Sequence, residues 1–204
     1  MLQDFTGKNV VITGGSRGIG RSCAKLFADL NANVIITFKS NENEAKRTLE
    51  ILAGSVGNHS MYVLDVADPL HVERCFGEIV SKYEQLDVLV NNAGIYIEHK
   101  INSISYYEWQ KAWNDTISTN LLGVSNLCYF AARQMIKQKK GKIVNISSRG
   151  AFRGEPDHPA YGASKAGLNA MSQSLAVALA PFGITVGIVA PGLLLEIRPI
   201  QKSV

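Results

Sequence analysis

The chain has 204 residues, a length that suits one domain, and 46% of them are hydrophobic, an ordinary fraction for a soluble globular protein. Its formal charge of +4, from 21 basic and 17 acidic residues, is too small and too dispersed to indicate a nucleic-acid-binding protein. No segment approaches the ~20 apolar residues that a membrane-spanning helix needs. We therefore expect one cytoplasmic domain over residues 1–204, without a nucleic acid or membrane partner.

Short β-branched runs alternate with longer segments of helical periodicity along the chain. The predicted strands are residues 8–13, 33–38, 60–64, 87–90, 142–146 and 185–189, and the predicted helices are residues 19–30, 42–52, 69–83, 116–138 and 159–180. Near-continuous apolar character in the strands indicates a parallel sheet that is covered on both faces. The alternation predicts an α/β, Rossmann-like fold of three layers, with a doubly wound parallel sheet in the middle.

The first predicted strand leads directly into a glycine-rich turn, Gly14-Gly15-Ser16-Arg17-Gly18-Ile19-Gly20, and a helix pattern follows. Glycine lets the backbone approach a pyrophosphate closely, while the free N–H groups and the positive end of the helix favour the anion. Such a turn is a weak signal when it stands alone. Its position between a strand and a helix, at the first crossover, predicts a dinucleotide-binding site.

The end of the second predicted strand indicates which dinucleotide binds. NAD-binding proteins usually carry an acid there, ~20 residues after the glycines, to hold the ribose hydroxyls. This chain instead has Thr37, Phe38 and Lys39. Lys39 and Arg17 would attract a 2′-phosphate, so we expect NADP(H), with NAD(H) less favoured. The alternative is that both cations are ordinary surface residues.

The segment YGASK places Tyr161 and Lys165 four residues apart, on one face of a predicted helix. A nearby lysine cation favours the phenolate form of tyrosine, which makes the phenol a usable acid and base. Ser147 and Ser148 follow the predicted strand 142–146, at the sheet edge where such folds bind ligands. Either hydroxyl could donate to a carbonyl oxygen, and their position after the strand does not distinguish the two.

These motifs together resemble the short-chain dehydrogenase/reductase family. The matching elements are residues 13–20 (TGGSRGIG), 91–94 (NNAG), Asn120, 143–148 (IVNISS), 161–165 (YGASK) and 191–192 (PG). They follow the order and spacing of the family and cover nearly the whole chain up to residue 192. The family's catalytic serine lies 13 residues before the tyrosine, and the resemblance therefore selects Ser148.

The resemblance implies a role for each of four catalytic residues. Tyr161 would donate the proton to a carbonyl oxygen, and Ser148 would orient that carbonyl. Lys165 would hold the nicotinamide ribose and support the tyrosine. Asn120 would hold a water that connects Lys165 to a proton relay.

The resemblance also implies where the cofactor is held. Asp65 would contact adenine, Asn91 would lie near the adenosine ribose, and Ile19 and Gly20 would flank the pyrophosphate. The full set of expected cofactor contacts is Gly14, Ser16, Arg17, Gly18, Ile19, Gly20, Lys39, Asp65, Asn91, Ala93, Gly94, Tyr161, Lys165, Pro191 and Gly192. No metal site is expected, because the histidines are scattered and the three cysteines fit no metal-binding spacing.

Three functional interpretations stay open at this point. The first is an NADP(H)-dependent enzyme that interconverts a carbonyl and a secondary alcohol, most similar in its motifs to 3-oxoacyl-acyl-carrier-protein reductases. The second is an NAD(P)-dependent alcohol or sugar dehydrogenase. The third is a truncated protein that binds the cofactor, lacks catalytic competence and acts through partners.

The expected partners follow from the same resemblance. The substrate would be a small carbonyl or alcohol, or a molecule bound to acyl-carrier protein. The two long helices that carry Asn120 and Tyr161 resemble the family's dimer-forming pair, so we expect a homodimer or homotetramer. After residue 192 the sequence LLLEIRPIQKSV has no strand pattern and lacks the family's threonine. We therefore expect the last strand of the sheet to be absent.

Overall fold

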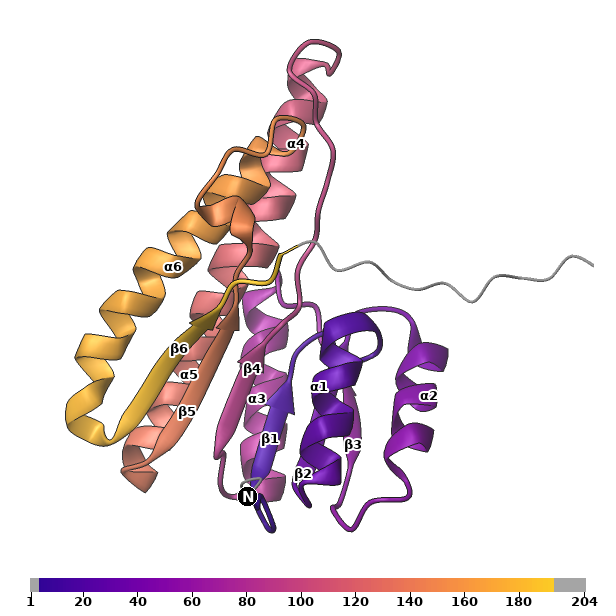
Figure 1. The fold of residues 1–204 in the computed structure, drawn as a ribbon, viewed down its shortest axis with the longest axis vertical. Coiled ribbons are helices and arrows are strands. Elements are labelled where there is room, and N and C mark those ends of the chain that lie inside the picture. The colour runs from indigo at the N-terminus through magenta and orange to yellow at the C-terminus, as the bar shows by residue number, and fades with distance from the viewer. Residues whose placement is uncertain (1–3, 193–204) are drawn as a thin grey trace, which may run out of the picture.

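The computed structural model describes residues 4–192 and has a six-stranded parallel sheet at its centre (Figure 1). The strand order is β3-β2-β1-β4-β5-β6, so the predicted doubly wound parallel sheet is confirmed. The strands are β1 (Asn9–Ile12), β2 (Asn33–Phe38), β3 (Ser60–Val63), β4 (Val88–Asn91), β5 (Gly141–Ile146) and β6 (Ile184–Val189). All of them lie within two residues of their predicted bounds.

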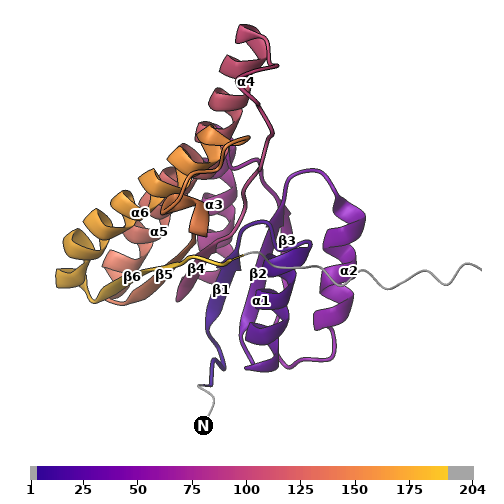
Figure 2. The ribbon, with the colours of Figure 1, turned by 45° about the horizontal axis from the view of Figure 1, so that its top comes forward.

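Helices cover both faces of the sheet, which confirms the three predicted layers. They are α1 (Gly18–Asp29), α2 (Glu42–Leu52), α3 (Pro69–Tyr83), α4 (Tyr106–Ile117), α5 (Gly123–Gln138) and α6 (Pro159–Leu179). Helices α1 and α2 pack on one face, and α3, α5 and α6 pack on the other. Figure 1 shows α1 in front of the strands and α5 behind them, and in both views α5 and α6 lie side by side (Figure 2).

The central strand β1 explains why consecutive positions within a strand are apolar. Its side chains alternate between the two faces of the sheet. Val10 and Ile12 pack in the core beneath α1 and α2, whereas Val11 packs in the core beneath α3 and α5, and all three are fully buried. A polar side chain at any of these positions would lie in an apolar core on one face or the other.

The topology creates a crevice between β1 and β4. From β1 the chain moves outward through β2 to β3, then returns through α3 to β4 on the opposite side of β1. The loops after β1 and β4 therefore leave the sheet in opposite directions at its carboxyl edge. Such a switch point is where open parallel sheets bind their ligands.

The helix predicted over residues 116–138 is wrong at its start. Helix α4 already begins at Tyr106, and a π-helical turn, Ser118–Leu122, connects it to α5. A capping box fixes the start: the Ser105 hydroxyl accepts from the Glu108 N–H at 3.3 Å, and the Glu108 carboxylate accepts from the Ser105 N–H at 3.2 Å. The sequence does carry this S-x-x-E signal. Figure 1 shows α4 extending well beyond the carboxyl ends of the strands.

The prediction that the last strand is absent concerns residues 193–204, which lie outside the described residues. Within residues 4–192, none of the helices combines the length and the apolar character that crossing a bilayer requires.

Candidate active site

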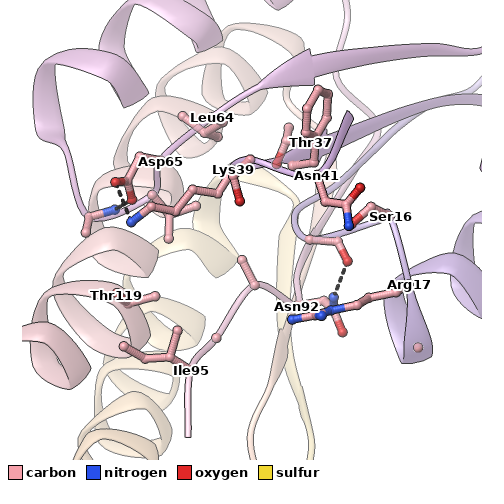
Figure 3. Close-up of a pocket in the computed structure, with 18 of the residues that line it drawn as sticks. Ser16, Arg17, Thr37, Lys39, Asn41, Leu64, Asp65, Asn92, Ile95 and Thr119 are labelled. Atoms are coloured by element: carbon pink, nitrogen blue, oxygen red, sulfur yellow. Dashed lines mark hydrogen bonds and ion pairs between the residues drawn. The ribbon is translucent and has the colours of Figure 1, made fainter. Parts of the chain in front are cut away.

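Two adjoining cavities open at the carboxyl edge of the sheet. The larger, about 820 Å³, runs from the glycine turn past the ends of β2 and β3 (Figure 3). The smaller, about 280 Å³, lies between the end of β5 and the start of α6. Ile19, Asn92, Gly94 and Ile95 line both cavities, so one extended molecule could occupy the two together.

The glycine turn has the backbone shape and the free donors that an anion needs. Gly14 and Gly18 have positive φ angles of +64° and +52°, which favour glycine. A side chain at Gly20 would collide with the Gly14 carbonyl, so helix and turn pack closely only with glycine there. At the N-terminus of α1 the N-cap residue, Arg17, gives no side-chain cap, and the first turn holds no acid. The first N–H groups of α1 therefore stay available for a phosphate.

Thr13 and Asn92 join the glycine turn to the loop after β4. The Thr13 hydroxyl accepts from the N–H groups of Asn92 and Ala93, both at 3.0 Å. The Asn92 side chain donates to the carbonyl oxygens of Thr13 at 2.9 Å and Gly14 at 3.0 Å, and Figure 3 shows the second of these bonds. Asn92 is missing from the predicted contacts, although it belongs to the same NNAG motif.

The structure does not bring Asn91 to either cavity. Asn91 is the last residue of β4, and its side chain points toward α5, where its Nδ2 lies 3.4 Å from Cys128 Sγ and donates to Asn145 Oδ1 at 2.8 Å. Only 2% of Asn91 is exposed. Successive side chains on a strand point to opposite faces, so the asparagine that reaches the crevice is Asn92. Gly20 also lies outside the cavity lining, beneath the turn.

Lys39 and Asp65, two of the predicted cofactor contacts, form an ion pair with each other. Lys39 Nζ lies 2.7 Å from Asp65 Oδ2, across the cavity from Arg17 (Figure 3). Partial burial raises the pKa of Asp65, but the hydrogen bonds from Lys39 and the Ala67 N–H outweigh it and hold that pKa below its usual range. Ser40 and Asn41, which were not predicted, also line this end of the cavity.

The smaller cavity brings together Ser148, Tyr161 and Lys165. Lys165 Nζ lies 5.7 Å from the centre of the Tyr161 ring and donates to the Ile146 carbonyl at 2.7 Å. Burial lowers the pKa of Lys165 to about 8. The Ser148 hydroxyl accepts from the Gly150 N–H at 3.1 Å, which leaves its own proton free to donate into the cavity.

Asn120 lies behind the cavity wall. It is fully buried in the π-helical turn, and its side chain bonds both backbone groups of Ile95: Oδ1 accepts from the N–H at 2.8 Å, and Nδ2 donates to the carbonyl at 2.9 Å. A Cβ added at Gly94 would lie 3.3 Å from Asn120 Oδ1 and 3.8 Å from Lys165 Nζ. Asn120 and Lys165 therefore lie close together beneath the same glycine.

The remaining predicted contacts all line a cavity. Pro191 and Gly192 line the smaller one, and the Pro191 carbonyl accepts from the Arg149 N–H at 3.2 Å. Tyr96, which was not predicted, also lines the smaller cavity: its ring stacks on His158 at 3.6 Å and meets Tyr161 edge-on at 4.7 Å. Ser16, Ala93 and the other predicted residues of the glycine turn line the larger cavity, except Gly20.

The whole arrangement suits one kind of chemistry. A phenol, a hydroxyl donor and a buried cation line one cavity, and an anion-binding turn lines the next. A phenol can exchange a proton with an oxygen that a hydroxyl holds in place, while the cation stabilises the resulting negative charge.

Comparison with known proteins identifies the family. Residues 8–197 match the family model for short chain dehydrogenase. The chain is similar to the 3-oxoacyl-acyl-carrier-protein reductase FabG of Staphylococcus aureus, with 38% identity over 189 residues, covering 93% of this chain and 75% of that protein. It is 39% identical over 189 residues to the reductase of the same name from Escherichia coli, covering 93% of this chain and 74% of that protein.

Solved structures with both nicotinamide cofactors are similar to this chain. A metagenomic short-chain oxidoreductase in complex with NADP has a TM-score of 0.84 and 31% identity, covering 94% of this chain and 85% of that one. An NAD+-bound xylitol dehydrogenase has a TM-score of 0.85 and 26% identity, and the match covers 93% of this chain and 72% of that one. The fold therefore accommodates either cofactor, and the choice depends on individual residues.

Proposed function

The chain belongs to the short-chain dehydrogenase family of oxidoreductases, and on that premise we propose that it uses NADP(H) to interconvert a carbonyl and a secondary alcohol. One observation carries the proposal: the cavity lined by Ser148, Tyr161 and Lys165 adjoins the cavity along the glycine turn. A nicotinamide cofactor that spans both would supply the hydride.

The described residues fit such a cofactor along its length. The uncapped N–H groups at the start of α1 would bind the pyrophosphate, and Gly94 leaves room for the nicotinamide ribose next to Lys165. Arg17 and Lys39 would bind the 2′-phosphate. To do so, Lys39 would leave its ion pair with Asp65 and pair with the phosphate instead.

The chain's own residues would carry the proton chemistry. Ser148 would donate a hydrogen bond to the substrate carbonyl oxygen, and Tyr161 would transfer its proton to that oxygen as negative charge develops. With a pKa of about 8, Lys165 stays mainly cationic at neutral pH and would stabilise the phenolate that remains. Asn120 would hold the backbone of Ile95, and with it the wall between the two cavities.

We propose a 3-oxoacyl thioester carried by acyl-carrier protein as the substrate. The support comes from the two relatives named 3-oxoacyl-acyl-carrier-protein reductase, which share 38% and 39% identity with most of this chain. We further propose a cytoplasmic homodimer or homotetramer formed through α5 and α6, whose outer faces expose Tyr129 and Val177.

The test combines binding and turnover. Wild type and Tyr161→Phe are titrated with NADPH by nicotinamide fluorescence, then assayed for NADPH oxidation with acetoacetyl-coenzyme A, a 3-oxoacyl thioester. We expect Tyr161→Phe to lower kcat by ~10²–10⁴-fold, because it removes the proton donor, and to bind NADPH as wild type does. Substantial turnover by the variant would refute the role of Tyr161. No turnover by wild type would refute the proposed substrate.

A further inference from the structure

The first turn of α6 carries Tyr161, the proposed proton donor, and its N–H groups have two different kinds of acceptor. The N–H groups of Tyr161 and Gly162 turn back to the His158 carbonyl, at 3.0 and 3.3 Å. The His158 side chain provides no cap. The N–H of Ala160, the residue before Tyr161, instead donates to His99 Nε2 at 3.1 Å, an acceptor 61 positions earlier in the chain.

His99 is held from several sides. Only 1% of the residue is exposed, and its ring makes edge-to-face contacts with Trp109 and Trp113 on α4 at centroid distances of 5.3 and 6.5 Å. The backbone N–H of His99 donates to the Asp157 carbonyl at 2.8 Å. Its Nδ1 lies 2.8 Å from the Ile97 carbonyl oxygen.

The two ring contacts determine the state of the imidazole. A carbonyl oxygen can only accept, so Nδ1 must carry a proton toward Ile97. The N–H of Ala160 can only donate, so Nε2 must lack one. Only the neutral tautomer protonated at Nδ1 satisfies both contacts. His99 is therefore fixed in one tautomer, with both nitrogens occupied.

We propose that His99 is a positioning residue that holds the start of α6, and thereby the phenol of Tyr161, against the loop after β4. The inference rests on the proposed function. The segment from Ile95 to His99 forms one wall of the smaller cavity through Ile95 and Tyr96, and α6 forms another through Tyr161 and Lys165. Through Ile97 on one side and Ala160 on the other, the imidazole joins these two walls.

Loss of His99 Nε2 as an acceptor would affect the position of the Tyr161 phenol. Ala160 is fully buried, so without His99 Nε2 its N–H would have neither a partner nor water. The first turn would have to shift to satisfy that group. Tyr161 is the next residue, and a displacement of ~1 Å at a reacting group can reduce the rate by ~100-fold.

Two variants separate the positioning role from simple packing. His99→Gln keeps an acceptor near the place of Nε2, whereas His99→Asn keeps a donor near the place of Nδ1 and loses that acceptor. With acetoacetyl-coenzyme A we expect kcat of His99→Asn to fall by ~10–100-fold, with KM and the Kd for NADPH nearly unchanged. His99→Gln should recover most of kcat. Equal kcat losses in both variants, or none in either, would overturn the proposal.

A measurement on the wild-type chain needs neither substrate nor variant. Nitrogen-15 NMR of the imidazole at neutral pH should show the neutral tautomer protonated at Nδ1, and the Ala160 amide should exchange slowly with solvent. A proton on Nε2, or rapid exchange at Ala160, would overturn the inference. Both readouts are independent of turnover. A failure of the proposed substrate, seen as an inactive wild type, is thus distinguishable from a failure of the role of His99.

Discussion

Lys165 is placed where its charge is unfavourable for folding. Burial lowers its pKa from 10.5 to about 8, and a difference of that size corresponds to about 3 kcal/mol. Below about pH 8 both the folded and the unfolded chain carry the proton, so the full cost of burying the cation is present. Between about pH 8 and 10.5 only the unfolded chain keeps it, so this contribution to the free energy of unfolding rises with pH.

We predict that Lys165→Met stabilises the protein at pH 7 by about 1–3 kcal/mol, because it removes a buried charge. The gain stays below the full cost, since the Ile146 carbonyl loses its donor. It should shrink as the pH rises from about 8 to 10.5. Urea unfolding of both proteins at pH 7 and pH 10 measures it. Lys25→Met, at an exposed lysine of α1, is the control, and a pH-independent gain would contradict the prediction.

Arg17 should discriminate between the two cofactors. It lies at the glycine turn, opposite the ion pair of Lys39 and Asp65, and forms no salt bridge within residues 4–192. We predict that Arg17→Ala weakens NADPH binding by ~10-fold or more and changes NADH binding little, because only NADPH carries the 2′-phosphate. Fluorescence titration measures both affinities, with Lys25→Ala as the control. Equal weakening of both would place Arg17 at the pyrophosphate instead.

At the level of elements, Arg21 connects the glycine turn to two helices. From α1 its guanidinium donates to the Ser16 carbonyl, to Thr48 Oγ1 at 2.9 Å and to the Glu44 carboxylate at 2.5 Å. The Thr48 hydroxyl lies 3.3 Å from the Gly15 carbonyl. One side chain thereby fixes α2 against the back of the turn. This network was not predicted from the sequence.

We predict that Arg21→Met weakens NADPH and NADH binding equally, by ~5–50-fold, because both cofactors place a pyrophosphate on the turn that Arg21 supports. The same titration distinguishes this uniform loss from the selective loss expected for Arg17→Ala. Arg47→Ala is a matched control, since Arg47 pairs with Glu44 from the solvent side, at 3.3 Å. A loss confined to one cofactor would contradict the supporting role.

The strands and most helices could be predicted because local patterns determine them. Strands buried on both faces are mainly apolar, and α6 begins at a proline and is followed by Pro181 and Gly183. The start of α4 was missed despite its S-x-x-E signal. The π-helical turn around Asn120 has no such signal.

The parts of the site that escaped prediction depend on tertiary register. Lys39 and Asp65 meet because β2 and β3 pair with Phe38 opposite Val63. Asn92, and not the predicted Asn91, lines the crevice, because β4 ends at Asn91 and the next residue begins the loop. Neither the strand pairing nor the end of β4 can be derived from the sequence alone. The motifs did identify Ser148, Tyr161 and Lys165, although their catalytic roles stay predictions, as does the single domain over residues 1–204.

For the whole molecule, the cavities lie where the two halves of the sheet meet, so a ligand there would contact both. Such a ligand binds only the folded chain and raises its stability by mass action. At ~100 times its Kd, NADPH should add about 2.7 kcal/mol and raise Tm by about 5–10 °C. A thermal shift assay measures this change, with NADH at the same concentration for comparison. A Tm that NADPH leaves unchanged would contradict binding at this junction.

The bonds of Thr13 also impose an order on folding. During synthesis, β1, β2 and β3 emerge before β4, and they can pair as soon as they are free of the ribosome. The Thr13 hydroxyl, however, accepts from the N–H groups of Asn92 and Ala93, which are made about 80 residues later. Until then the glycine turn lacks its support on that side, and the edge of β1 stays open. A nascent chain that ends before β4 would therefore contain the whole glycine motif without a formed cofactor site.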